Sequence, residues 1–383
     1  MRFTLKLLPS RAANLGILEL NHPKALHALT MDMIECMQDV FAEWFHSPSI
    51  KAILFKANNS EAKRPAFCAG GDVKAVWELG MSQKDPQTTS RFFYEEYQVN
   101  FAIATCTKPI ISLWDGVVMG GGVGISIHGK YRVATDHTLF AMPETAIGLF
   151  PDVGSMYWMP RLLSPPVAKY LALTGQRIKA SDLIYTGLAT HYVPSQKLPE
   201  LEKALIQATD TDDGDEGTPS STTDDEDVVG GVLDSFHENI ETEKCHLAVN
   251  QQAINTYFQS DTCEDIFAAL AAQPNDTFAV ETLKTLQKMS PTSMKVTLEG
   301  LKRGGAVSTI GEDLQMEYRM ARASTLPGAD FFEGVRAMLV DKDQSPKWNP
   351  PTLQAVSEQT VEAFFAPIQE EWPIPSSSTT SKL

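Results

Sequence analysis

The positions of hydrophobic and polar residues follow two different periods along the first half of the chain. Residues 15–20 alternate as expected for a short strand, whereas residues 31–45 repeat apolar side chains at three-and-four spacing, which predicts a helix. Further strands are predicted at residues 51–56, 109–114 and 131–135, with glycine-rich or polar loops and helical stretches between them. Strands that alternate with helices indicate an α/β or α+β core.

The last third of the chain is predicted to be mostly helical. Its helical segments are residues 243–257, 263–271, 276–289, 291–303 and 309–324. We expect a core over residues 1–208, a disordered surface loop over 209–231, a helical region over 232–372 and a flexible tail over 373–383. The loop is assigned because it holds nine acidic residues, no Lys or Arg, and too few apolar residues to fold.

Composition excludes several classes of protein. A chain of 383 residues with 43% hydrophobic side chains can bury a substantial core. Its formal charge of −16 would repel phosphate backbones and anionic lipids, so neither nucleic acid nor membrane is expected as a partner, although nine of these charges lie in the acidic loop. Five cysteines without a C-x-x-C pair favour a reduced compartment and predict no disulfide framework and no zinc site.

Two glycine-rich loops are candidates for binding a developing negative charge. They are Cys68-Ala-Gly-Gly-Asp-Val-Lys and Met119-Gly-Gly-Gly-Val-Gly, and each follows an apolar, strand-like run. Backbone N–H groups that converge from two such loops can stabilise an oxyanion, and a helix that begins at the second loop adds the positive end of its dipole. The alternative is that these glycines only permit tight turns and close packing.

Three familiar glycine motifs are nearly matched but incomplete. The segment that starts at Gly124 fits a P-loop until Tyr131, which stands where Ser or Thr would hold magnesium. A dinucleotide-binding fingerprint lacks its final glycine. The nucleophile elbow G-x-S-x-G is matched through Ser126 but broken by His128 at its last position. Nucleotide binding and serine-hydrolase chemistry are therefore disfavoured.

Two carboxylates lie in an otherwise apolar segment, Ala141-Met-Pro-Glu-Thr-Ala-Ile-Gly-Leu-Phe-Pro-Asp-Val-Gly. Burying Glu144 and Asp152 would be costly unless they are paired or used, so acid, base or nucleophile chemistry is expected here. The alternative is a cap or turn role, since Pro-Glu and Pro-Asp commonly begin turns.

Taken together in order, four segments resemble the crotonase superfamily of enoyl-CoA hydratases and isomerases. They are Asn21-His-Pro-Lys-Ala-Leu-His-Ala-Leu, Phe67-Cys-Ala-Gly-Gly-Asp-Val-Lys, Gly120-Gly-Gly-Val-Gly and Met142-Pro-Glu. Within the superfamily, three further segments are similar to the 3-hydroxyisobutyryl-CoA hydrolase family: Phe140-Ala-Met-Pro-Glu-Thr, Gly148-Leu-Phe-Pro-Asp-Val-Gly and Glu333-Gly-Val-Arg-Ala. The likeness covers nearly the whole chain apart from the acidic loop and the tail.

The resemblance implies a fold and a binding mode. The fold is a crotonase-like spiral of repeated ββα turns in two roughly perpendicular sheets, followed by a helical C-terminal region. Coenzyme A, as part of the substrate and not a separate cofactor, would lie along residues 24–28 and 71–74. The resemblance also implies that a homo-oligomer can form. The implied oxyanion-hole and substrate-binding residues are Gly71, Asp72, Val73, Lys74, Gly121 and, for the phosphates, Lys342.

The acids implied by the resemblance favour hydrolysis. Hydratases of the superfamily use two glutamates, but here Gly124 occupies the first position while Glu144 keeps the second. Asp152 stands where hydratases have a small residue, and Glu96 matches a further substrate-contacting acid. We therefore expect hydrolysis of a short 3-hydroxyacyl-CoA, most simply 3-hydroxyisobutyryl-CoA. The alternatives are an enoyl-CoA hydratase or isomerase on the same fold and a non-catalytic acyl-CoA-binding protein.

The two ends of the chain suggest a localisation. The chain finishes Ser381-Lys382-Leu383, which is the tripeptide read by the peroxisomal import receptor. Its first residues lack the apolar stretch of a cleavable leader. We therefore expect a peroxisomal matrix enzyme. The alternative is a cytosolic or mitochondrial enzyme with a fortuitous tail.

Overall fold

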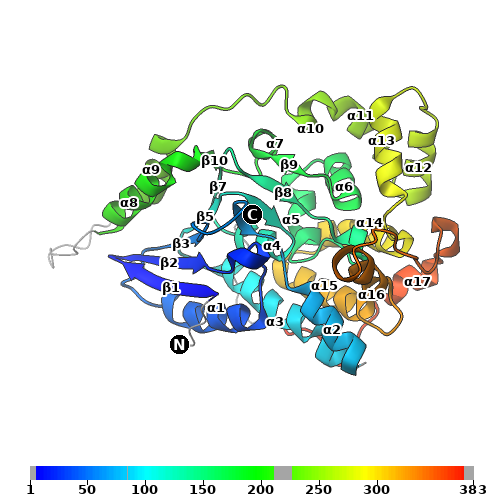
Figure 1. The fold of residues 1–383 in the computed structure, drawn as a ribbon, viewed down its shortest axis with the longest axis horizontal. Coiled ribbons are helices and arrows are strands. Elements are labelled where there is room, and N and C mark those ends of the chain that lie inside the picture. The colour runs from blue at the N-terminus through cyan, green and yellow to red at the C-terminus, as the bar shows by residue number, and fades with distance from the viewer. Residues whose placement is uncertain (1–5, 84, 211–226, 375–383) are drawn as a thin grey trace.

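The computed structural model describes residues 6–83, 85–210 and 227–374, whose strands form two sheets (Figure 1). The larger sheet has the order β1-β2-β3-β5-β7-β10, in which β1 pairs antiparallel with β2 and the other neighbours pair in parallel. The smaller sheet has the order β4-β6-β8-β9, with β9 antiparallel to β8. The strands are β1 (Leu7–Ala12), β2 (Leu15–Leu20), β3 (Ala52–Ala57), β4 (Ala66–Cys68), β5 (Ile110–Trp114), β6 (Val117–Met119), β7 (Tyr131–Ala134), β8 (Leu139–Ala141), β9 (Ile178–Lys179) and β10 (His191–Tyr192).

The strand order shows a repeating ββα turn. β3 and β4, β5 and β6, and β7 and β8 each place one strand in the larger sheet and the next in the smaller sheet, and helices follow each pair. This is the spiral core implied by the resemblance, and the fold prediction is confirmed. The helices of this half are α1 (Met31–Trp44), α2 (Val73–Gln83), α3 (Pro86–Thr105), α4 (Gly121–Ile127), α5 (Ser155–Leu162), α6 (Pro165–Thr174), α7 (Ala180–Thr186) and α8 (Leu198–Thr209), with short turns η1 (Pro23–Ala25), η2 (Glu144–Ile147) and η3 (Ser195–Lys197).

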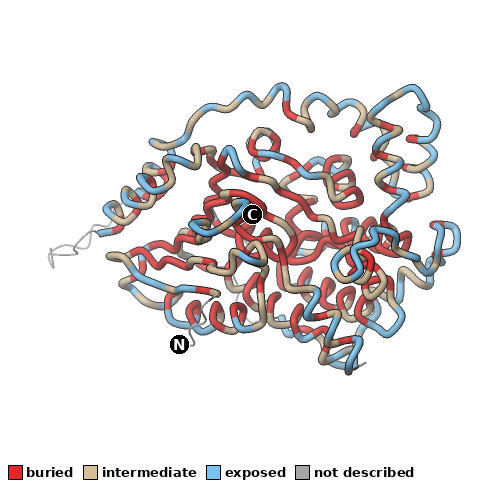
Figure 2. Tube along the Cα trace, in the orientation of Figure 1, coloured by how far each residue is buried: buried red, intermediate tan, exposed pale blue. Residues whose placement is uncertain are grey.

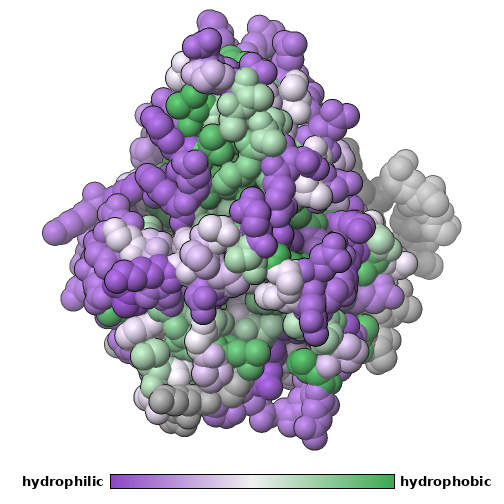
Figure 3. Space-filling model, turned by 90° about the vertical axis from the view of Figure 1, so that its right-hand side faces the viewer, coloured by the Kyte–Doolittle hydropathy of each residue, from purple (hydrophilic) through white to green (hydrophobic). Residues whose placement is uncertain are grey.

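The second half is helical, as predicted. It contains α9 (Val228–Phe236), α10 (His246–Val249), α11 (Gln251–Tyr257), α12 (Cys263–Ala271), α13 (Thr277–Leu286), α14 (Pro291–Ala306), α15 (Ile310–Ser324), α16 (Asp330–Val335) and α17 (Glu358–Ala363), with a π-helical turn η4 (Arg336–Val340) and a 3-10 turn η5 (Leu353–Ala355). The predicted helix at 243–257 is divided into α10 and α11 at Asn250. Figure 3 shows the face over these helices as largely hydrophilic, with hydrophobic side chains gathered between the hydrophilic ones.

Both faces of the larger sheet are covered, which explains why its central strands are almost continuously apolar. On one face, α1 and α3 pack in the main core (Figure 2). On the other face, Leu205 of α8 and Leu233 of α9 pack in a second cluster with Leu54 of β3 and Ile111 of β5. None of the helices in the described ranges has the length and apolar character needed to cross a bilayer.

The acidic segment is shorter at both ends than predicted. Thr209 is the last residue of α8, and α9 already begins at Val228 inside the predicted loop. Asp227 caps α9 by accepting a hydrogen bond from Gly230 N at 2.9 Å, and it also bonds Lys130 and the Tyr131 hydroxyl. A short hydrophobic stretch beside a capping acid therefore folds as a helix against the sheet. Residues 211–226 lie outside the described part of the chain.

Candidate active site

Three strand ends of the smaller sheet meet at a cavity of about 280 Å³. Because β4, β6 and β8 are parallel, their carboxyl ends lie at one edge of the sheet. The segments that leave this edge carry Gly70 and Gly71 after β4, Gly120 and Gly121 after β6, and Glu144 after β8, and all five residues line the cavity. Parallel sheets of α/β proteins commonly bind their ligands at such an edge.

The two glycine loops approach each other so closely that a side chain would not fit between them. A Cβ atom on Gly121 would lie 3.1 Å from Gly71 N and 2.3 Å from Glu96 Oε1. Leu29 N donates to Gly70 O and Asp72 N donates to Leu29 O, each at 2.8 Å, which fixes the backbone on either side of Gly71. Gly121 is the first residue of α4, where backbone N–H groups have no partner within the helix. The loops are therefore built to bring backbone N–H groups towards one point.

Three buried carboxylates face the cavity from different elements. Glu96 on α3, Glu144 at the start of η2, and Asp152 before α5 are 2%, 5% and 4% exposed, respectively. Glu96 Oε1 and Glu144 Oε2 have no hydrogen-bond partner among the described residues, whereas Asp152 Oδ2 accepts the Tyr97 hydroxyl at 3.1 Å. Two carboxylate oxygens are thus left for a substrate or a water molecule.

Burial raises the pKa of all three carboxyl groups. It raises the pKa of Glu144 well above its usual value, and the negative charge of Asp152 raises it further. Burial likewise raises the pKa of Asp152 to about 7, against the opposing hydrogen bond from Tyr97. The pKa of Glu96 is raised by burial and then by Asp152. Carboxylates with raised pKa values are suited to accept protons near neutral pH.

Position 124 has no room for the first of the two hydratase glutamates. A Cβ atom on Gly124 would lie 2.5 Å from the Cβ atom of Val153, and real Cβ atoms do not approach so closely. The acid that hydratases carry at this position is therefore excluded by packing. Asp152, the residue before Val153, supplies an acid to the cavity instead.

The structure brings together six of the predicted site residues and leaves three outside the cavity. Those that line it are Gly71, Val73, Glu96, Gly121, Glu144 and Asp152. Asp72 instead caps α2 through Ala75 N at 3.1 Å, Lys74 is exposed beside Glu78, and Lys342 is exposed just after η4 with φ 59°. These three lie next to cavity residues in the chain or in the same C-terminal segment, and their contact with coenzyme A stays a prediction.

The expected coenzyme A segment at 24–28 does not line the cavity, but it runs beside the first glycine loop. Leu26 O accepts from Ala69 N at 3.0 Å, and Leu26 and His27 both have positive φ. This segment therefore helps to shape the approach to the cavity. Its binding role also stays a prediction.

Several residues that line the cavity were not predicted from the sequence. Phe92 lies one turn before Glu96 on α3, so helical spacing alone places it on the same face. Arg177 follows a turn that packs on Pro143, and Met338 and Leu339 come from η4 near the end of the chain. No local pattern in the sequence indicates that these last three residues reach the site.

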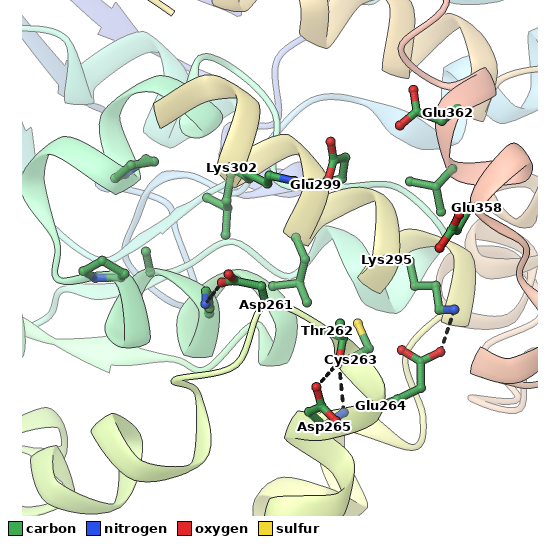
Figure 4. Close-up of a pocket in the computed structure, with 17 residues that line it drawn as sticks. Asp261, Thr262, Cys263, Glu264, Asp265, Lys295, Glu299, Lys302, Glu358 and Glu362 are labelled. Atoms are coloured by element: carbon green, nitrogen blue, oxygen red, sulfur yellow. Dashed lines mark hydrogen bonds and ion pairs between the residues drawn. The ribbon is translucent and has the colours of Figure 1, made fainter. Parts of the chain in front are cut away.

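A larger hollow of about 1020 Å³ lies elsewhere, between α6, α12, α14 and α17 (Figure 4). Two of its lysines are paired with acids of the same hollow: Lys169 contacts Asp261 and Lys295 contacts Glu264, both at 2.6 Å. It contains none of the predicted site residues. Within the described ranges, no group of His, Cys, Asp or Glu is placed to hold a metal ion, here or at the smaller cavity.

A ββα spiral with two converging glycine loops and buried acids at one sheet edge defines an enzyme of the crotonase class. The chain belongs to the enoyl-CoA hydratase/isomerase family, whose profile matches residues 15–365. The chain is 44% identical over 357 residues to "3-hydroxyisobutyryl-CoA hydrolase, mitochondrial" of Gallus gallus, covering 92% of this chain and 86% of that protein. It is 42% identical to the Homo sapiens protein of the same name, covering 91% and 86%.

Two solved structures share the fold over nearly the whole chain. A carnitinyl-CoA dehydratase from Mycobacterium thermoresistibile has a TM-score of 0.85 at 35% identity and covers 98% of this chain and 100% of its own. An enoyl-CoA hydratase from Rhodobacter sphaeroides 2.4.1 has a TM-score of 0.81 at 34% identity and covers 95% and 98%. Both belong to the class of enzyme that the fold indicates.

The peroxisomal localisation predicted from Ser381-Lys382-Leu383 is wrong. Relatives from Gallus gallus, Xenopus laevis and Homo sapiens are all named mitochondrial, which points to mitochondria, and the peroxisomal import receptor is accordingly not supported as a partner. The import receptor reads only three terminal residues, and so short a motif can arise by chance. The tripeptide lies outside the described residues.

Proposed function

We propose that the chain hydrolyses a short 3-hydroxyacyl-CoA thioester, 3-hydroxyisobutyryl-CoA, to the free acid and coenzyme A, which would place it in valine degradation. The observation that carries this proposal is the pair of acids in the cavity. Asp152 and Glu144 are present and buried, while packing against Val153 excludes the first hydratase glutamate at position 124. The names of the relatives from Gallus gallus and Homo sapiens support the same activity.

The cavity residues divide the reaction between them. The N–H groups of Gly71 and Gly121 hold the thioester oxygen as it becomes negative. Glu144 either attacks the carbonyl carbon to form a mixed anhydride or removes a proton from an attacking water. In both routes the carbon–sulfur bond breaks, the thiolate of coenzyme A leaves and is protonated, and one water molecule is consumed. Asp152 binds the substrate hydroxyl or steers the water and the thiolate.

A comparison of two reactions tests the proposal. Short acyl-CoAs with and without a 3-hydroxyl group are screened for thiol release, and 2-enoyl-CoAs are screened for loss of the double bond. We expect thiol release to dominate and to be fastest with 3-hydroxyisobutyryl-CoA. The two solved relatives are titled as a dehydratase and a hydratase, so faster hydration than thiol release would favour that second function. Binding without either reaction would indicate a non-catalytic protein.

Replacing Asp152 with Asn is expected to lower kcat/KM for 3-hydroxyisobutyryl-CoA by about ten- to a hundredfold, the usual worth of a hydrogen bond to a charged group. The loss with isobutyryl-CoA should be smaller, because this substrate has no hydroxyl for the carboxylate to bind. Parallel kinetics on the two substrates make the measurement. An equal loss on both would show that Asp152 does not recognise the hydroxyl group.

The raised pKa values predict the pH dependence of hydrolysis. Because the reaction needs carboxylate forms and the pKa of Asp152 is about 7, kcat/KM should fall as pH drops through neutrality, whereas an ordinary carboxyl would lose its charge only near pH 4. The Asp152→Asn substitution removes the charge that helps to raise the pKa of Glu144, so the acidic limb should move to lower pH. A limb unchanged by this substitution would contradict the coupling.

The raised pKa of Asp152 also predicts how the stability of the fold depends on pH. A carboxyl whose pKa is raised on folding holds its proton more tightly in the folded state, so its contribution to stability is lost as pH rises through the folded pKa. For Asp152 that pKa is about 7. The melting temperature of the wild-type protein should therefore fall more between about pH 4 and pH 7, the unfolded and folded pKa values of Asp152, than that of the Asp152→Asn variant. Thermal unfolding at a series of pH values measures this difference.

A further inference from the structure

Asp152 is followed by a turn that its sequence does not favour. Val153 has φ 58° and Gly154 has φ 80°, so two successive residues adopt the left-handed region. Glycine reaches this region freely, but a β-branched residue is strained there and stays in it only when its surroundings hold it. Val153 is completely buried. The surroundings of this turn must therefore supply the constraint.

His128 holds the turn at Val153. The pKa of His128 is lowered to about 4 by burial, so its ring is neutral near neutral pH. Its Nε2 lies 2.9 Å from Val153 O, and because a carbonyl oxygen only accepts, the proton must be on Nε2. Its Nδ1 has no partner in the part of the chain that the structure describes, which agrees with this tautomer.

Glu317 holds the turn at Gly154 from the other side. It lies on α15, is completely buried, and accepts hydrogen bonds from Gly154 N at 2.7 Å and from Met156 N at 3.0 Å. Both oxygens of one carboxylate thus bind the first turn of α5, which follows directly after Asp152 and Val153. Glu317 does not line the cavity, so it cannot touch the substrate there.

We propose that Glu317 and His128 form a clamp that positions Asp152. The two side chains hold the strained turn from outside the cavity. The Asp152 carboxylate therefore stays directed to Tyr97 and the cavity. This inference rests on the proposed function, because the clamp matters to hydrolysis only through Asp152. A purely structural role would be different: Glu317 would then stabilise α5 as an ordinary cap, with no coupling to Asp152.

A double-mutant cycle separates the two roles. Glu317→Gln keeps the shape of the side chain but leaves one acceptor oxygen for two N–H groups. We expect it to lower both kcat and kcat/KM for 3-hydroxyisobutyryl-CoA by about tenfold, since the geometry at Asp152 is disturbed. Added to Asp152→Asn, it should cause no further loss, because Glu317 acts through Asp152. Multiplied losses in the double variant would overturn the proposal.

The chain offers a matched control. Asp182 is 3% exposed and accepts hydrogen bonds from Leu247 N at 2.8 Å and from Lys179 N at 3.2 Å, but it does not line the cavity. Asp182→Asn should lower the melting temperature while kcat stays at the wild-type value. A fall in kcat for Glu317→Gln no larger than that of this control would also overturn the proposal.

His128 gives a second route if the Glu317 variant does not fold. His128→Gln keeps an N–H donor near the place of Nε2, whereas His128→Leu removes it. We expect the Leu variant to lose kcat in the same non-additive way with Asp152→Asn, and the Gln variant to recover most of it. Equal losses in both variants would show that the hydrogen bond to Val153 O is not what matters.

Hydrogen exchange separates failure of the clamp from failure of the proposed function. Loss of the clamp should speed amide exchange at Gly154 and Met156, whatever reaction the enzyme performs. Wild-type kcat/KM for 3-hydroxyisobutyryl-CoA in Asp152→Asn would refute the role given to Asp152 in hydrolysis. Unchanged exchange at these two amides in Glu317→Gln would refute the clamp itself.

Discussion

Replacing Glu144 with Gln is expected to lower turnover by about a thousandfold or more while acyl-CoA binding stays close to that of the wild type. The amide keeps the shape of the side chain but can neither attack the thioester nor accept a proton from water. Single-turnover thiol release and equilibrium binding of the substrate measure the two effects. Activity within about tenfold of the wild type would contradict the assignment of Glu144.

Two comparisons show whether the loss of turnover comes from unfolding or from a general effect of replacing a glutamate. Because Glu144 is buried with a raised pKa, its uncharged replacement should melt no lower than the wild type at alkaline pH, which excludes unfolding as the cause of the loss. Glu264→Gln provides a control, since Glu264 lies in the larger hollow and pairs with Lys295. It should leave turnover unchanged.

Gly121→Ala is expected to reduce kcat by about a hundred- to a thousandfold, the usual effect of losing one oxyanion-hole donor. The new methyl group would lie 2.3 Å from Glu96 Oε1 and 3.1 Å from Gly71 N, so the Glu96 carboxylate would have to turn away and the backbone at Gly71 would have to shift slightly. Steady-state kinetics on 3-hydroxyisobutyryl-CoA test this. Turnover near the wild-type value would show that the loops do not form the oxyanion hole.

Gly231→Ala is the matched control for this change. Gly231 lies in α9, and a Cβ atom there would meet no atom within 4 Å. Alanine favours a helix over glycine by about 1 kcal/mol, so this variant should unfold at a slightly higher temperature with unchanged kcat. The different effects of the two Gly→Ala changes on kcat then reflect the surroundings of each glycine and not the substitution itself.

Strong periodicity explains which elements were predictable. The strands at 15–20 and 109–114 and the helix at 31–45 have enough residues to show a clear period, and all three are found. β4 and β6 have three residues each, which is too short for alternation to be detected. These short strands nonetheless set the site, because the glycine loops begin where they end.

The chemistry of the site was predictable where it is local in the sequence. Glycine loops and acids such as Glu144 and Asp152 can be recognised within single segments. Glu317 could not be, since it contacts Gly154 across 163 positions of the chain, and nothing in the sequence of its own helix indicates that contact. The strain at Val153 is also invisible in sequence, because φ is imposed by partners from other elements. Long-range packing therefore decides how the recognisable residues are aimed.

The contribution of η4 to the cavity has a consequence for biosynthesis. Met338 and Leu339 complete the cavity wall, and Glu317 reaches the Asp152 turn from α15, so parts of the site are made last. Domains commonly fold from the N-terminus while the ribosome is still at work. A nascent chain that ends at residue 208 would carry both glycine loops and all three cavity acids, but it would lack the outer wall and Glu317, which is one half of the clamp. The growing polypeptide should therefore remain without thioesterase activity until synthesis is nearly finished, and then gain it in one step.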